Sequence, residues 1–334
     1  MIKKFLKYHP AHKKIAPKFD TIFLLRPTMF FSVWVMVVVG IISAELNMHA
    51  TPLWIIKFSW EIFFVFLGLT LLISSTFIFS QVADEKNDYD NQKLFLIGKY
   101  ISAEKGISIA KILLISGGLI SIIANWITAV PAIGIFFLLR IGYNQAPFEW
   151  TKAPFSIWLV NSFVGVLLFI IGWILGMQNY PSIGIIPLSI DTLFHMVPYV
   201  LGFSAVSLLA TLPDIKDSTP LYARAYPTVL GTSTTLLLTL VMIIIALYYS
   251  IKHSDPLAST ATLVSLPFFV FASLRKLKKD IIRAIRYPIF IINFFTLSYY
   301  PWLVVPLLCT YYLSKYYYWH RFDVHYPTFL VDND

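Results

Sequence analysis

The chain has 334 residues, of which 58% are hydrophobic and 13% charged, and its mean hydropathy is +0.73. Soluble globular domains carry about 25% charged residues, so this composition excludes a water-soluble globular protein. Apolar stretches that match the roughly 20 residues needed for a helix to cross a bilayer core recur from Met29 to the end of the chain. The sequence therefore predicts a single membrane domain over residues 1–334.

Nine hydrophobic segments are expected to span the membrane as helices. They are long apolar runs without period-two alternation, and a helix satisfies its own backbone hydrogen bonds in lipid. A basic tail, 1–25, precedes them and a polar tail, 315–334, follows them. We therefore expect an all-α polytopic bundle. Its spans are 28–45, 60–82, 107–124, 127–142, 156–177, 193–213, 228–250, 257–273 and 286–311.

The formal net charge of +9 would suit a nucleic-acid partner, but the positions of the charges argue against one. With the N-terminus in the cytoplasm, 22 of the 26 lysines and arginines fall on the cytoplasmic side of the nine spans. This asymmetry follows the positive-inside rule. We expect a multi-pass protein among membrane lipids, in the inner membrane if bacterial, with no nucleic-acid partner. The basic residues expected on the opposite side are Lys57, Lys252, Lys315 and Arg321.

Two acidic loops on the expected cytoplasmic side carry the residues best suited to chemistry. In VADEKNDYDNQK, Asp84 and Asp88 are four apart, so a continued helix places both carboxylates on one face. In PDIKDSTP, Asp214 and Asp217 are three apart at the end of the sixth span. Either pair alone also suits a solvated loop, whereas both pairs together suit a diphosphate held by Mg²⁺, which binds carboxylates and phosphate oxygens. The matched loops also suggest two pseudo-repeated halves.

Four motifs resemble those of the UbiA family of membrane prenyltransferases. LLRPTMFF resembles the start of that family's first span, and SQVADEKND is similar to its NxxxDxxxD motif, with Ser80 in the asparagine place. KLFLIGKYIS resembles RPLxxGxIS, with Lys93 in the place of the arginine. GYNQAPFEWTKAP resembles YSxPPxRxKxxP. LPDIKDSTPLYARAYPTVLG resembles the second aspartate motif, without its later acid and glycine.

The resemblance implies a helical bundle around a central cavity, in which a prenyl group passes from a prenyl diphosphate to a lipophilic acceptor with the help of Mg²⁺. The implied acceptor is a quinone precursor, a tetrapyrrole, a carotenoid or a lipid alcohol. A cation held by the aspartates would neutralise the diphosphate leaving group. The implied catalytic residues and metal ligands are Asp84, Asp88, Asp214 and Asp217, and the implied substrate-binding residues are Ser80, Lys93, Tyr143, Lys152, Asn161 and Arg224.

Ordinary roles in a membrane protein compete with several of these assignments. Tyr143 stands at a span end, where tyrosines form an aromatic belt, and Lys152 suits a snorkelling lysine. Asn161, inside the fifth span, faces a cavity or bonds a neighbouring helix. His195, inside the sixth span, is expected to be buried and hydrogen-bonded rather than a ligand.

A catalytically degenerate scaffold is the alternative to the enzyme. In that case the carboxylates would bind a cation or a lipid head group, or serve transport. Coupling sites of transporters usually lie near the membrane midplane. The aspartates here lie at one membrane face beside basic residues, which favours the enzyme.

Overall fold

The computed structural model describes residues 9–48, 58–85, 96–142, 155–178, 188–212 and 230–328. These ranges are helical and contain no named strand. Among the described residues, eight helices are long and apolar enough to cross a membrane, and a ninth, shorter apolar helix covers Trp126–Ile141. The predicted all-α membrane fold is confirmed, with the same number of apolar helices as expected spans.

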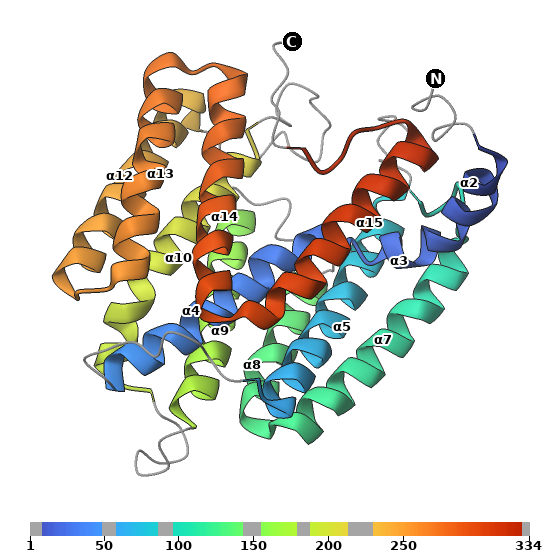
Figure 1. Cartoon of the computed structure of the whole chain (residues 1–334), viewed down its shortest axis with the longest axis horizontal. Helices are drawn as coiled ribbons and strands as arrows, with labels where there is room; N and C mark the ends of the chain where they lie inside the picture. Colours follow the sequence, from blue (N-terminus) through green and yellow to red (C-terminus); the bar gives the residue numbers. More distant parts are fainter. Residues whose placement is uncertain are drawn as a thin grey trace.

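The helices form a bundle in which α4 and α9 lie between two flanking groups of helices (Figure 1). One group contains α5, α7 and α8, and the other contains α10, α12, α13 and α14. The bounds are α2 (Pro10–Ile15), α3 (Asp20–Leu24), α4 (Phe30–Met48), α5 (Trp60–Ala83), α7 (Ala103–Ala124), α8 (Trp126–Phe137), α9 (Ser156–Met177), α10 (Ile190–Ala210), α12 (Thr232–Lys252), α13 (Pro256–Arg275), α14 (Lys278–Tyr299) and α15 (Val304–Phe322).

Glycines bring α4 and α9 into backbone contact at the centre of the bundle. A Cβ atom on Gly172 would collide with the carbonyl oxygen of Val37, and one on Gly176 would lie 2.7 Å from the Cβ of Ala44. Gly40 faces the same contact from α4. Small residues allow this approach, and close approach is a main source of helix association in lipid, where water does not drive helices together.

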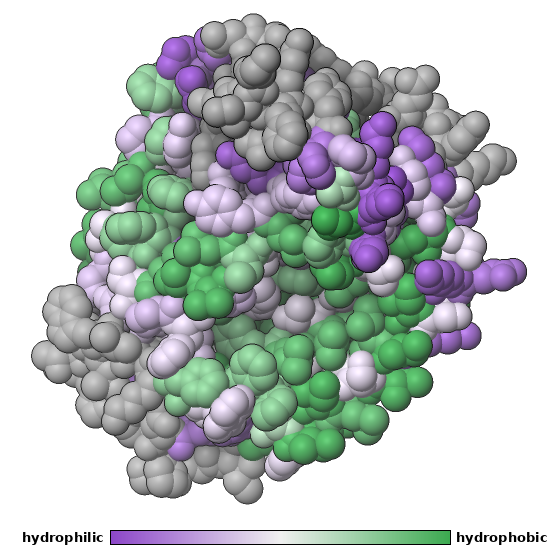
Figure 2. Space-filling model, turned by 45° about the vertical axis from the view of Figure 1, so that its right-hand side comes forward, coloured by the Kyte–Doolittle hydropathy of each residue, from purple (hydrophilic) through white to green (hydrophobic). Residues whose placement is uncertain are grey.

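The outer surface of the bundle is apolar, as lipid requires. Helix α7 exposes Ile112, Ile115, Leu119 and Ile123, the last with 83% of its surface accessible. Figure 2 shows a broad hydrophobic face on one side of the molecule, with hydrophilic residues gathered toward one end. A patch of this kind on a water-soluble monomer would mark an interaction site, and here it marks contact with the membrane.

The last expected span, 286–311, is wrong in its bounds. Helix α14 begins earlier, at Lys278, and ends at Tyr299, because Pro301 follows within two residues and starts a short 3₁₀ turn, η7 (Pro301–Leu303). Helix α15 then continues through Phe322, well into the expected polar tail, and in Figure 1 it runs toward α2 and α3.

The placement of Arg321 opposite the basic N-terminal tail is also wrong. Arg321 forms an ion pair with Asp20, at the start of α3, with 2.8 Å between the nitrogen and oxygen atoms. The prediction is wrong because the expected span 286–311 is divided between two helices, α14 and α15. A chain that turns back at Pro301 returns its C-terminal helix to the side of the N-terminal segment.

Candidate functional site

The first predicted motif lies at the end of α5. Ser80 is in the last turn, and Asp84 is the C-terminal cap, whose backbone N–H donates to the carbonyl oxygen of Ser80 at 2.9 Å. Both residues are half-buried. The spacing of four residues therefore stacks them one helical turn apart, as predicted. The remaining predicted site residues, apart from Asn161, lie outside the described residues: Asp88, Lys93, Tyr143, Lys152, Asp214, Asp217 and Arg224.

Gln81 connects this helix end to the N-terminal segment. Its Nε2 atom donates to the carbonyl oxygen of Leu24 at 2.8 Å and to that of Phe77 at 3.2 Å. The side chain is 8% exposed. Gln81 is not among the predicted site residues, although an amide between Ser80 and Asp84 in an apolar helix is a recognisable signal for a contact between segments.

The second half of KLFLIGKYIS has a clear folding role. Gly98 has a φ of +80° and donates its N–H to the carbonyl oxygen of Ile101 at 2.9 Å. A Cβ atom there would collide with the carboxylate of Glu85, so this turn lies against the end of α5. Ser102 then caps α7 by accepting the N–H of Lys105 at 3.4 Å. The glycine and serine of the motif therefore shape the loop next to Asp84.

A guanidinium group lies beside the motif. Arg140 belongs to η3 (Leu138–Gly142), a π-helical turn that follows α8, and its Cζ atom is 4.4 Å from the ring centroid of Phe79. This distance is within the range of a cation–π contact. Phe79 immediately precedes Ser80, so Arg140 contacts the C-terminal part of α5, which carries the first aspartate motif. From the sequence, Arg140 is one of the 22 lysines and arginines expected on the cytoplasmic side and has no predicted role in the site.

Asn161 bonds a neighbouring helix. Its Nδ2 atom donates to the hydroxyl of Ser207 at 3.1 Å, and the hydroxyl of Ser204 donates to that of Ser162 at 2.7 Å. These two bonds connect α9 to α10. The structure thus shows the helix-bonding alternative for Asn161, and its contact with substrate stays a prediction.

His195 differs from its expected state. The residue is half-buried, and its Nδ1 atom is buried without a hydrogen-bond partner among the described residues. Its ring lies 5.8 Å from that of Trp173 and 6.1 Å from that of His253, measured between centroids. The histidine is therefore packed among rings, and the predicted hydrogen bond is not found at Nδ1.

Of the four predicted Mg²⁺ ligands, Asp84 is the one among the described residues. No group of three or more His, Cys, Asp or Glu residues in those ranges would hold a metal ion. Asp84 nevertheless offers a hard oxygen donor at a helix end, and Mg²⁺ commonly takes one or two carboxylates together with phosphate oxygens and water. The carboxylate of Asp84 is therefore a suitable Mg²⁺ ligand. That all four predicted aspartates meet at one metal site stays a prediction.

Comparisons with known proteins bear on the family and the fold of the chain. The profile of the UbiA prenyltransferase family matches residues 33–294. No curated protein matches the sequence significantly. A solved structure concerned with digeranylgeranylglyceryl phosphate synthase in membranes is similar, with 12% identity and a TM-score of 0.58, over 86% of this chain and 97% of that chain.

An apo structure of a UbiA homologue from Aeropyrum pernix K1 is also similar, with 12% identity and a TM-score of 0.58, over 83% of this chain and 97% of that chain. At this identity the two structures support the fold alone. The family profile, in contrast, covers most of the chain, including most of α4, all of α5 and the first aspartate motif. The chain belongs to the UbiA prenyltransferase family.

Proposed function

We propose that this protein transfers a prenyl group from a prenyl diphosphate to a lipophilic acceptor within the membrane, in an Mg²⁺-dependent reaction. Beyond family membership, the proposal is carried by the placement of Ser80 and Asp84 at the end of α5, where the guanidinium of Arg140 contacts the ring of Phe79, the residue before Ser80. A carboxylate and a guanidinium at the same end of a helix suit a ligand that brings both a metal ion and negative phosphate oxygens.

The chain would supply electrostatic stabilisation and positioning. Bound Mg²⁺ would offset the charge of the leaving diphosphate. Asp84 would hold the cation, the hydroxyl of Ser80 would bond a diphosphate oxygen, and Arg140 would attract the anion. Groups held in place before the reaction stabilise developing charge without having to reorganise. The further proposed ligands and binding residues are Asp88, Asp214, Asp217, Lys93, Tyr143, Lys152, Asn161 and Arg224.

Two departures from the family motifs affect diphosphate binding. Lys93 stands where the family has an arginine, so it keeps the charge but loses the bidentate fork. The second motif reads PDIKDSTPLYAR and lacks a later acid, although Asp214 and Asp217 remain. We therefore propose weaker diphosphate binding than the full motifs would give, with the transfer reaction retained.

The site is proposed to face the cytoplasm, together with the N-terminus. The distribution of lysines and arginines supports this orientation. The acceptor is proposed to be a quinone precursor, a tetrapyrrole, a carotenoid or a lipid alcohol, because each is lipophilic and carries a nucleophilic position.

A direct experiment tests donor and acceptor together. Purified protein is incubated with Mg²⁺, a membrane lipid extract and isotopically labelled prenyl diphosphates of several chain lengths, and the lipids are analysed by mass spectrometry. We expect one lipid class to gain the prenyl mass as diphosphate is released, only when Mg²⁺ is present. Binding of the labelled diphosphate without transfer to any lipid would instead support the degenerate binding protein.

A further inference from the structure

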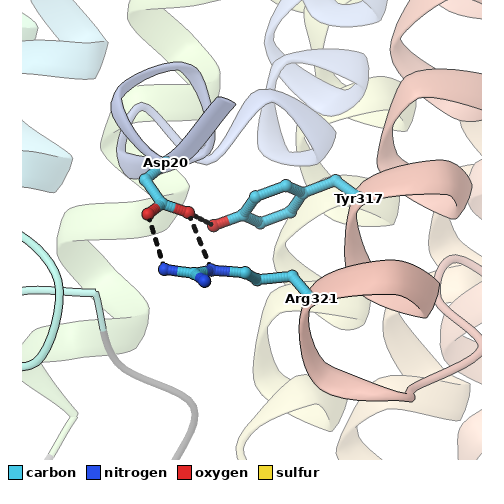
Figure 3. A network of polar contacts seen from close by, with 3 residues as sticks. All are labelled: Asp20, Tyr317 and Arg321. Carbon is cyan, nitrogen blue, oxygen red and sulfur yellow. Dashed lines mark hydrogen bonds and ion pairs between the residues drawn. The ribbon is translucent and has the colours of Figure 1, made fainter. Parts of the chain in front are cut away.

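A buried ion pair connects the two ends of the chain. The carboxylate of Asp20, a residue 7% exposed, accepts hydrogen bonds from Arg321 Nε at 3.1 Å and from a terminal guanidinium nitrogen at 2.8 Å. The hydroxyl of Tyr317 donates to the same carboxylate at 2.7 Å. Figure 3 shows the three side chains converging between α3 and α15. We call these three residues the terminal clamp.

Aromatic packing reinforces the terminal clamp on both sides. The rings of Phe23 and Tyr317 are stacked, with centroids 3.9 Å apart and an interplanar angle of 1°. The guanidinium Cζ of Arg321 lies 3.8 Å from the ring centroid of Tyr100, in the turn beside Gly98. Burial, together with the bond to Asp20, raises the pKa of Tyr317, so its phenol stays protonated and remains a donor.

The clamp contacts the end of α5 through an apolar cluster. Leu24, adjacent to Phe23, is fully buried and receives the hydrogen bond from Gln81. Ile78 of α5 is also fully buried in this cluster. The cluster thus joins the N-terminal segment, α5, the turn beside Gly98, α7 and α15. Its buried members are Phe23, Leu24, Ile78, Leu96, Ile97, Ile101, Ala110 and Tyr317.

We propose that the terminal clamp positions the first aspartate motif. Asp20 and Arg321 both lie outside residues 33–294, the part matched by the family profile. It acts through Leu24 and Gln81, and Gln81 lies between Ser80 and Asp84. Loosening the clamp would let the last turn of α5 fray and move the carboxylate of Asp84. This inference rests on the proposed function.

The alternative is that the terminal clamp only stabilises the fold and does not position the motif. A control variant at a second buried carboxylate distinguishes these two roles. Asp280 is another buried carboxylate, 2% exposed, paired at 3.3 Å with Arg275 and at 3.3 Å with Arg283. It packs beside a separate apolar cluster formed by residues of α10, α12, α13 and α14. Asp280→Asn should therefore destabilise the protein to a similar degree without touching α5.

The experiment measures hydrogen exchange of the peptide covering residues 74–85 in nanodiscs, at a temperature below unfolding of every variant. Asp20→Asn should speed exchange in this peptide by about tenfold or more, because exchange reports local opening and a broken buried ion pair no longer opposes fraying of the last turn of α5. Asp280→Asn should leave that peptide at the wild-type rate. Arg321→Lys keeps the charge and should fall between the wild type and Asp20→Asn, which covers the case in which Asp20→Asn does not fold.

Kinetics with labelled prenyl diphosphate then test the link to the site. Asp20→Asn should raise the Mg²⁺ concentration needed for half-maximal transfer by about tenfold, whereas Asp280→Asn should not change it. Equal effects of the two variants on exchange and on Mg²⁺ dependence would overturn the proposal. If the wild type transfers nothing, the proposed function fails, and unchanged exchange in Asp20→Asn would show separately that the clamp does not hold α5.

Discussion

The hydroxyl of Tyr199 donates to both carboxylate oxygens of Asp255, at 2.9 and 3.1 Å, and so joins the middle of α10 to the start of α13. Asp255 is 2% exposed and also caps α13, accepting the N–H of Ala258 at 2.9 Å. Burial raises the pKa of Asp255, while the bonds from Ala258 and Tyr199 oppose that rise. One carboxylate thus satisfies a buried phenol and a helix end.

Asp255→Ala is expected to destabilise the protein strongly. Losing the cap costs about 1 kcal/mol, and leaving the Tyr199 hydroxyl buried without a partner costs about 1–3 kcal/mol more. Asp255→Asn retains a capping oxygen and should lose less. Thermal unfolding in detergent, followed by circular dichroism, measures both. Equal unfolding midpoints for Asp255→Ala and the wild type would show that neither bond contributes.

Gly172→Ala is expected to separate α4 from α9. The added methyl group meets the carbonyl oxygen of Val37, which belongs to a helix backbone and cannot rotate away. Overpacking of this kind typically costs about 1–3 kcal/mol. Gly118→Ala is the control, because no atom lies within 4 Å of a Cβ there, and removing a helical glycine should be neutral or slightly stabilising. The prediction fails if both variants unfold at the same temperature.

Asp84→Asn is expected to lower prenyl transfer by at least about a hundredfold, since removing a single electrostatic contact to developing charge commonly has an effect of this size. The protein should still fold and insert, because Asp84 is a half-buried helix cap rather than a core residue. Glu104→Gln, an exposed carboxylate at the start of α7, is the control and should keep full activity. Transfer by Asp84→Asn at the wild-type rate under limiting Mg²⁺ would remove Asp84 from the site.

Lys278 and Lys252 are expected on opposite sides of the membrane. Both are exposed, at the start of α14 and the end of α12. Replacing Cys309, the one cysteine of the chain, leaves a background into which Lys278→Cys or Lys252→Cys introduces a unique thiol. In sealed right-side-out vesicles, an impermeant maleimide should label Lys252→Cys and leave Lys278→Cys unlabelled. Labelling of both from the outside would contradict the arrangement of spans.

The sequence predicted those parts of the fold that depend on residues close together in the chain. Long apolar runs indicated the spans, and the spacing of Ser80 and Asp84 indicated their shared face. Helix α15 was missed because Lys315, His320 and Arg321 make its second half read as a polar tail. What holds it is a set of polar and aromatic contacts to the N-terminal segment, and no local pattern reports contacts at that distance along the chain.

The candidate site was predictable to a similar extent. The relative positions of Ser80 and Asp84 in the first aspartate motif could be predicted, because residues four apart in a helix lie on the same face. Arg140 was not recognised, because a lone arginine at a span end has the same signature whether it serves topology or a ligand. Its position over Phe79 depends on how α8 packs against α5, which the sequence of either helix alone does not determine.

The ion pair between Asp20 and Arg321 also has a consequence for biosynthesis, because its partners are 301 residues apart. At about 5–20 residues per second, translation of the intervening chain takes roughly 15–60 s. During that interval every helix from α4 to α14 is synthesised before Asp20 can pair with Arg321. The contact between the N-terminal segment and α15 therefore forms only after Arg321 has left the ribosome, and in a chain that stops short of Arg321 the carboxylate of Asp20 lacks this partner.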